Sequence, residues 1–87
     1  MVVNETELFF IFSCPHCNQM IEVKKTELNC RIFRCGTYKS NSNPIPPHTS
    51  KIECDRLKQS ELIFGCSKPF KFVTVDDIND VIVCDYI

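Results

Sequence analysis

The order of apolar and polar residues predicts several short strands. Residues 8–13 are almost all apolar or aromatic, which predicts a strand covered on both faces. Met20–Lys24 alternates apolar and polar residues and predicts a half-buried strand, with a short helix as the alternative. Residues 62–64 are predicted as a further strand. Residues 30–38 fit no single pattern, although Ile32 and Phe33 are expected in the core.

The C-terminal quarter of the chain predicts a hairpin. Residues 70–75 alternate, residues 81–87 are mostly apolar, and the polar stretch 76–80 between them predicts the turn. The two apolar segments would pair as a C-terminal hairpin within a meander of short strands.

One helix is predicted, over about residues 50–60. Ser50 is followed three residues later by Glu53, which is the spacing of a capping box. Ile52, Cys54 and Leu57 would form its inward face. Residues 39–47, with three Pro among Ser and Asn, predict a loop. The expected fold is a small α+β domain spanning 1–87, a metal-stabilised, zinc-ribbon-like β-meander with one short helix.

The cysteine content changes this picture most. Seven Cys in 87 residues is an odd number, so complete disulfide pairing would leave one thiol over. Residues 1–7 carry no basic residue, and the apolar run after them is too short for an export signal or a membrane span. We therefore expect an intracellular rather than a secreted protein, in which cysteines bind metal. A chain this short also gains from such a staple, because its core alone supplies about 3–5 kcal/mol.

The strongest local motif is Cys14-Pro15-His16-Cys17. Two thiolates separated by two residues on a tight turn can bind one zinc ion, as in a zinc ribbon. Cys66, directly after Gly65, predicts part of a second half-site. A fourth ligand must come from elsewhere, since a structural zinc site is tetrahedral.

Eight candidate ligands suffice for two tetrahedral sites, and the simplest partition is nested. The outer site would take Cys14, Cys17, Cys66 and Cys84. The inner site, with the spacing C-x4-C-x12-H-x5-C, would take Cys30, Cys35, His48 and Cys54. If Cys84 is instead a core thiol of an apolar strand, one zinc ion is expected and the second is in doubt.

Neither catalysis nor redox chemistry is favoured. Sites rich in thiolates are usually closed, and the H-x-E element of the zinc deaminases is missing after His48. The order C-P-H-C also occurs in thioredoxin-like oxidants, but there the first Cys begins a helix, and the residues after Cys17 alternate like a strand. We expect no enzyme, with a thiol oxidoreductase acting through Cys14 and Cys17 as one alternative.

The charge distribution supplies a second alternative. The net charge is −1, yet all ten Lys and Arg lie between Lys24 and Lys71, where the net charge is +6. Residues 1–23 carry −3 and residues 72–87 carry −4. A basic middle can face nucleic acid, or it can simply be a solvated surface around an anionic thiolate cluster.

The chain resembles a group of small cysteine-rich proteins encoded by large DNA viruses and phages. The resembling segments are 14–17, 29–36, 47–57, 63–70 and 84–87. Those relatives carry His at the position of Cys35, an exchange that implies a zinc ligand. The resemblance implies a zinc-binding fold in a viral setting, in the host cytoplasm or nucleus or in the virion, as a virion or transcription-associated component. The expected function is a non-enzymatic zinc module that binds a protein partner, without membrane or small-molecule substrate.

Overall fold

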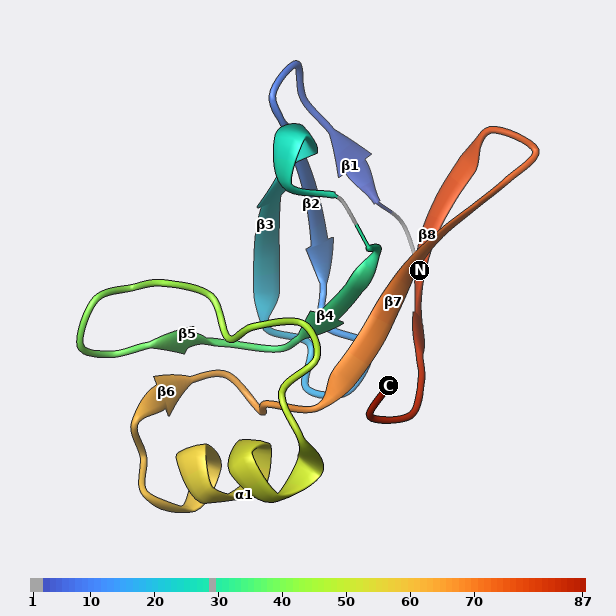
Figure 1. Ribbon diagram of the computed structural model, residues 1–87. Coiled ribbons are helices and arrows are strands. Elements are labelled where there is room, and N and C mark those ends of the chain that lie inside the picture. Colours follow the sequence, from blue (N-terminus) through green and yellow to red (C-terminus); the bar gives the residue numbers. More distant parts are fainter. Residues whose placement is uncertain (1–2, 29) are drawn as a thin grey trace.

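The computed structural model describes residues 3–28 and 30–87. It shows a small α+β fold with antiparallel sheets and one α-helix in the described part of the chain (Figure 1). The elements are β1 (Asn4–Glu5), β2 (Phe9–Ser13), β3 (Met20–Lys24), the 3-10 turn η1 (Lys25–Glu27), β4 (Ile32–Arg34), β5 (Thr37–Tyr38), α1 (Lys51–Gln59), β6 (Ile63–Phe64), β7 (Pro69–Val75) and β8 (Ile78–Val83). Among these residues, no helix is long and apolar enough to cross a membrane.

The strands form three small sheets. One has the order β1-β2-β3, the second β4-β7-β8, and the third is the pair β5-β6. In the second sheet β7 pairs with both neighbours, so that Phe70 faces Phe33 on one side and Val83 on the other. This strand order places β4 and β8 on opposite sides of β7. Cysteines that follow β4 and β8 are therefore kept apart.

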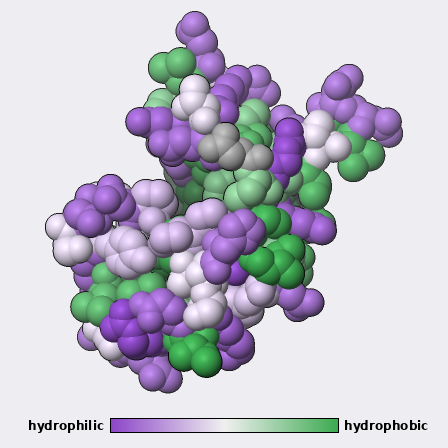
Figure 2. All heavy atoms as spheres, in the orientation of Figure 1, coloured by the Kyte–Doolittle hydropathy of each residue, from purple (hydrophilic) through white to green (hydrophobic). Residues whose placement is uncertain are grey.

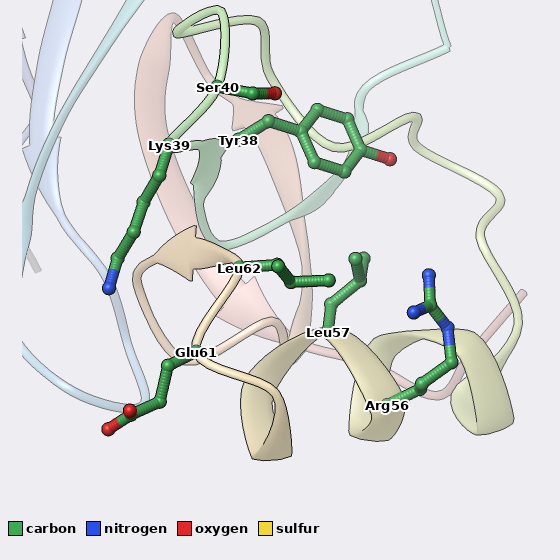
Figure 3. A pocket seen from close by; sticks show the side chains of 7 residues that line it. All are labelled: Tyr38, Lys39, Ser40, Arg56, Leu57, Glu61 and Leu62. Atoms are coloured by element: carbon green, nitrogen blue, oxygen red, sulfur yellow. The ribbon is translucent and has the colours of Figure 1, made fainter.

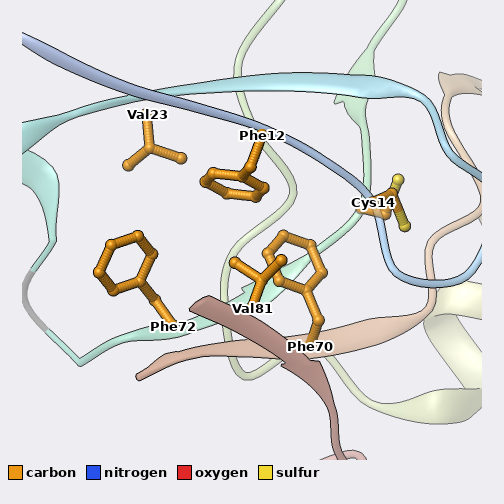
Figure 4. Close-up of a cluster of buried hydrophobic side chains, with 7 residues drawn as sticks. Phe12, Cys14, Val23, Phe70, Phe72 and Val81 are labelled. Carbon is orange, nitrogen blue, oxygen red and sulfur yellow. The ribbon is translucent and has the colours of Figure 1, made fainter. Parts of the chain in front are cut away.

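Aromatic rings fill the space between the first two sheets. The ring of Phe12 on β2 lies 5.7 Å from that of Phe70 and 6.2 Å from that of Phe72, measured between centroids. Phe70, Phe72 and Val81 are buried beneath it (Figure 4). Phe10 adds a contact of 4.8 Å to Phe72. Within β2 only Phe12 is buried and the other residues are half-buried, so the prediction that both faces are covered holds in part.

The predicted helix is present and begins as its sequence indicates. The Ser50 hydroxyl accepts a hydrogen bond from the Glu53 backbone N–H at 3.2 Å, which caps the first turn. Cys54 and Leu57 are buried, and Leu57 joins Ile45 and Ile63 in a second, smaller core. The prediction for Ile52 is wrong, since its side chain is exposed. Two residues turn a helix by about 200°, so Ile52 cannot share the face of Cys54.

The C-terminal hairpin is confirmed, but its turn is shorter than predicted. Only Asp76 and Asp77 form it, both with positive φ (51° and 61°), which is the conformation of a two-residue type I′ turn. Asp tolerates this conformation because its short side chain can bond locally. Strand β8 consequently starts at Ile78 instead of residue 81, and residues 84–87 lie beyond its end.

Candidate metal centre

Four cysteine thiols meet where the three sheets join. The sulfurs of Cys14, Cys17, Cys35 and Cys66 all lie within 4.8 Å of one another. The Sγ atoms of Cys14 and Cys66 are 3.8 Å apart, and those of Cys17 and Cys35 are also 3.8 Å apart. A tetrahedral ion with metal–sulfur bonds of about 2.3 Å requires sulfurs about 3.8 Å apart. A disulfide requires about 2.05 Å. The cluster therefore has the geometry of a metal site that all four thiolates could share.

The first half-site is a tight turn between β2 and β3. Cys14 follows the last residue of β2, and its N–H donates to the Gln19 carbonyl at 2.8 Å. The Asn18 N–H donates to the Cys14 carbonyl at 3.0 Å, and Asn18 has a positive φ of 64°. The backbone N–H of His16 donates to the sulfur of Cys14 at 3.4 Å. The turn thus aims both thiols at one point, as the Cys14–Cys17 spacing predicts.

The second half-site combines two segments that are distant in sequence. Cys35 follows the end of β4, and Cys66 lies between β6 and β7. The Cys35 N–H donates to the Lys68 carbonyl at 3.1 Å, and the Ser67 N–H donates to the Cys35 carbonyl at 2.7 Å. These two bonds fasten the Cys35 segment to the Cys66 segment, so each supplies one thiol to the same cluster.

Both glycines of the chain stand at this crossing. Gly36 follows Cys35 and Gly65 precedes Cys66, with φ values of 142° and 113°. A Cβ at Gly65 would lie 2.7 Å from the Cys35 carbonyl oxygen and 2.7 Å from Gly36 Cα. A Cβ at Gly36 would lie 2.4 Å from the Phe64 carbonyl oxygen. Only residues without a side chain let the two backbones approach closely enough to bring Cys35 beside Cys66.

The pKa values of the clustered thiols shift in different directions. Burial raises the pKa of Cys14. A hydrogen bond to Cys66, together with burial, raises the pKa of Cys35, whereas the hydrogen bond from Cys35 lowers the pKa of Cys66 to about 5. Cys14 and Cys35 are fully buried, Cys66 is partly buried and Cys17 is exposed. Four thiolates in this space repel one another, and a cation is what allows all four to ionise together.

The structure groups the candidate ligands differently from the nested partition. Cys35, predicted for the inner site, takes the fourth position that was predicted for Cys84. Because β7 separates β4 from β8, residues just past the ends of these two strands are about two strand spacings, roughly 10 Å, apart. Cys84 therefore lies on the far side of β7 from Cys35.

The other predicted ligands point to separate places. The Cys30 thiol is exposed and faces its neighbouring carbonyl of Ile32 at 3.6 Å. The Cys54 thiol is buried in α1 and faces the Thr49 carbonyl at 3.7 Å. The Nδ1 atom of His48 hydrogen-bonds the Ile87 carbonyl at 2.9 Å. Within residues 3–28 and 30–87, no second group of three or more ligand side chains comes together.

Sequence reasoning also missed a buried arginine near the centre. Arg34, which precedes Cys35, is 4% exposed and donates from Nε to the Thr49 carbonyl and from Nη2 to the Ile87 carbonyl, each at 3.0 Å. Its guanidinium also lies 5.2 Å from the centre of the Tyr86 ring. Arg34 thereby ties the segment after β8 to the start of α1. Its place at the end of a short strand carries no sequence signal for this role.

The surface also has two hollows, both separate from the four-cysteine cluster. One, of about 670 Å³, runs along β3 and β4 and has Met20, Ile21 and Phe33 among its lining residues. The other, of about 480 Å³, lies between α1 and the residues after β5, with Tyr38 and Leu57 in its wall (Figure 3). Among the side chains drawn there, the carboxylate of Glu61 points away from the rest. Neither hollow contains any of the four clustered cysteines.

Comparison with known proteins adds no relative. No family model matches the sequence, no curated protein matches it, and no solved structure matches the fold. The fold and the site themselves define a small, cysteine-rich α+β protein with a four-cysteine cluster that could hold a metal ion.

Proposed function

We propose that the chain is a non-enzymatic zinc-binding module in which one zinc ion is held by Cys14, Cys17, Cys35 and Cys66. The single observation that carries the proposal is the set of four sulfurs within 4.8 Å of one another, with two pairs at the 3.8 Å that a tetrahedral zinc site requires. Four thiolates in a tetrahedron favour zinc or iron among biological metals. Zinc is preferred here because it needs no redox partner and serves as a structural staple in small domains.

The arrangement supports a structural rather than a catalytic ion. A catalytic zinc keeps one position open for water or substrate, whereas four cysteines would occupy every position of this one. Two half-sites joined across strands also correspond to the zinc-ribbon plan, with one departure. The first half-site is a single turn, but the second is divided between Cys35 and Cys66 on separate segments.

A protein partner is the proposed target, and the β7–β8 hairpin is the surface proposed to contact it. Val75 and Ile78 face each other at the hairpin end and are 64% and 69% exposed. Figure 1 shows the hairpin projecting from the body of the molecule, and Figure 2 shows apolar side chains on that projection. The viral setting implied by the resemblance, as a virion or transcription-associated component, belongs to the same proposal.

Zinc titration of the reduced, metal-free chain tests the metal. We expect far-ultraviolet circular dichroism and amide NMR shifts to change from an unfolded to a folded spectrum and to saturate at one equivalent. Replacement of zinc by cobalt should give the absorption of a tetrahedral tetrathiolate complex. A chain that is folded before metal is added, or a pale cobalt spectrum typical of oxygen ligands, would contradict the proposal.

A hairpin variant tests the partner. Val75→Ser with Ile78→Ser should keep one zinc ion and the folded spectrum but lose the protein that co-purifies with the tagged chain from its natural setting. Ile52→Ser on α1 is the matched control, because Ile52 is 84% exposed and lies on another element. Equal recovery of the protein by both variants would exclude the hairpin as the docking surface.

A further inference from the structure

An exposed aromatic side chain with lysines on it and on neighbouring segments lies beside the four-cysteine cluster. The Phe64 platform is defined here as Phe64 together with Lys39, Lys58 and Lys68. It adjoins the Cys66 half-site, since Phe64 and Lys68 lie on either side of Gly65, Cys66 and Ser67 in the chain. Figure 1 places β6, which carries Phe64, at the opposite end of the molecule from the tip of the β7–β8 hairpin. The platform is thus distinct from the surface proposed for a protein partner.

Phe64 is exposed because of its position in the β5–β6 pair. Ile63, its neighbour on β6, is buried against Leu57 of α1, and alternation along a strand turns the next side chain to the other face. Phe64 accordingly keeps 56% of its surface in solvent. The fold gains little from a large ring placed there, so the ring is available for contact.

One lysine contacts this ring, and two more lie on segments next to it. The Nζ atom of Lys39 is 5.4 Å from the ring centre of Phe64, which is a cation–π distance. The Nζ atom of Lys58 reaches from α1 to donate to the Gly65 carbonyl at 3.1 Å. Lys68 is exposed two residues after Cys66. The ammonium groups of Lys39 and Lys58 are thereby placed at Phe64 and at the residue that follows it, and Lys68 belongs to the same stretch of chain.

These lysines are not neutralised by carboxylates. The salt bridges found among the described residues join Lys25 to Glu5, Lys51 to Asp55 and Arg56 to Glu53, and none of them includes a platform lysine. A zinc ion with four thiolates carries a charge of −2, which three lysines more than balance. The lysines thus keep their ammonium groups free for an anionic ligand, and Glu61, three residues before Phe64, is the nearest acid in the sequence.

We infer that the Phe64 platform binds single-stranded nucleic acid, with one unpaired base stacked on Phe64 and the neighbouring phosphates contacting the lysines. A flat exposed ring flanked by cations is how proteins bind single strands with little sequence preference. A duplex offers no free base face to such a ring. An acidic peptide would satisfy the lysines but has no flat group to place on the ring.

Fluorescence anisotropy of the zinc-loaded full chain with labelled oligo(dT) and oligo(U) tests this inference. We expect binding at low salt. The logarithm of the association constant should fall with the logarithm of the salt concentration at a slope of about −2, since each of three phosphate contacts contributes about −0.7. Lys39→Gln with Lys58→Gln should reduce the slope to about −0.7. Phe64→Leu should weaken binding at least about fivefold, and Phe64→Trp should retain it.

A matched control distinguishes a specific effect of the platform lysines from the effect of losing positive charge anywhere on the surface. Lys24→Gln removes an exposed lysine at the end of β3 away from the cysteine turn and should leave affinity and slope unchanged. Zinc content, measured on every variant, should stay at one ion. The inference is overturned if the parent chain does not bind at low salt, if Phe64→Leu binds as well as the parent, if Lys24→Gln costs as much as the platform lysines, or if poly-glutamate binds the platform more tightly than the oligonucleotides.

Discussion

Replacing Gly65 by Ala should lower both the stability of the fold and the metal affinity of the four-cysteine cluster. Gly65 lies where the Cys35 and Cys66 segments cross. The new Cβ would meet the Cys35 carbonyl oxygen and Gly36 Cα at 2.7 Å each and the Cys35 carbonyl carbon at 3.0 Å. All three are backbone atoms of Cys35 and Gly36, so none can rotate aside. The φ of 113° adds strain, because residues with a side chain rarely adopt it.

The expected cost follows from these two terms. Backbone strain of this kind is worth about 1–3 kcal/mol. Overpacking against a rigid neighbour adds about 1–3 kcal/mol. We therefore expect a loss of about 3 kcal/mol or more in the free energy of unfolding. For a domain of this size such a loss lowers the melting temperature by about 12–24 °C. If it were expressed wholly as metal affinity, zinc would bind about 100-fold more weakly.

Thermal unfolding of the zinc-loaded chain and competition with a chromophoric chelator measure the two effects. Ser40→Ala is the control, because Ser40 is an exposed loop residue and its replacement should change stability by no more than about 0.5 kcal/mol. A Gly65→Ala protein that melts with the control and holds zinc equally well would refute the reasoning that the glycine crossing builds the second half-site.

Three further predictions concern the core, the helix and acid. Phe70→Ala should cost about 3–5 kcal/mol in urea unfolding, because Phe70 is 1% exposed, whereas Phe64→Ala should cost far less; equal costs would contradict the assigned core. Ser50→Ala should cost about 1 kcal/mol through loss of the helix cap, and Ser50→Asp should retain most of the stability, which a chemical denaturation series can check. Lowering the pH from about 7.5 to about 5 should release the metal and unfold the chain together, because protons compete with the metal for the thiolates and stability falls as the pH falls. Native mass spectrometry can measure both changes, and loss of the metal from a chain that stays folded would contradict this prediction.

The parts of the fold that depend on neighbouring residues could be predicted from the sequence. The strand Met20–Lys24 follows its alternation, and the helix cap follows the three-residue spacing of Ser50 and Glu53. The Cys14–Cys17 turn belongs to the same kind, since two thiols two residues apart need only a local turn to converge. The sequence predicts a turn at Asp76 but not its length, because the type I′ conformation depends on how the flanking strands twist.

The second half-site could not be predicted in this way. Whether Cys35 or Cys84 completes the cluster depends on β7 lying between β4 and β8, and strand order is a property of the whole chain. His48 and Cys54 are near in sequence, yet one faces Ile87 and the other is buried in α1. A local sign was nevertheless present. The chain has two glycines, and each adjoins a cysteine of the second half-site, at Cys35 and at Cys66.

Native mass spectrometry of the parent chain and two serine variants tests the central claim most directly. We predict one zinc ion per parent chain, one per Cys84→Ser chain, and loss of bound zinc and of the folded charge-state distribution in Cys35→Ser. This result would follow because Cys35 belongs to the four-cysteine cluster and Cys84 does not. Two ions in the parent, or zinc retained by folded Cys35→Ser and lost by Cys84→Ser, would contradict the account.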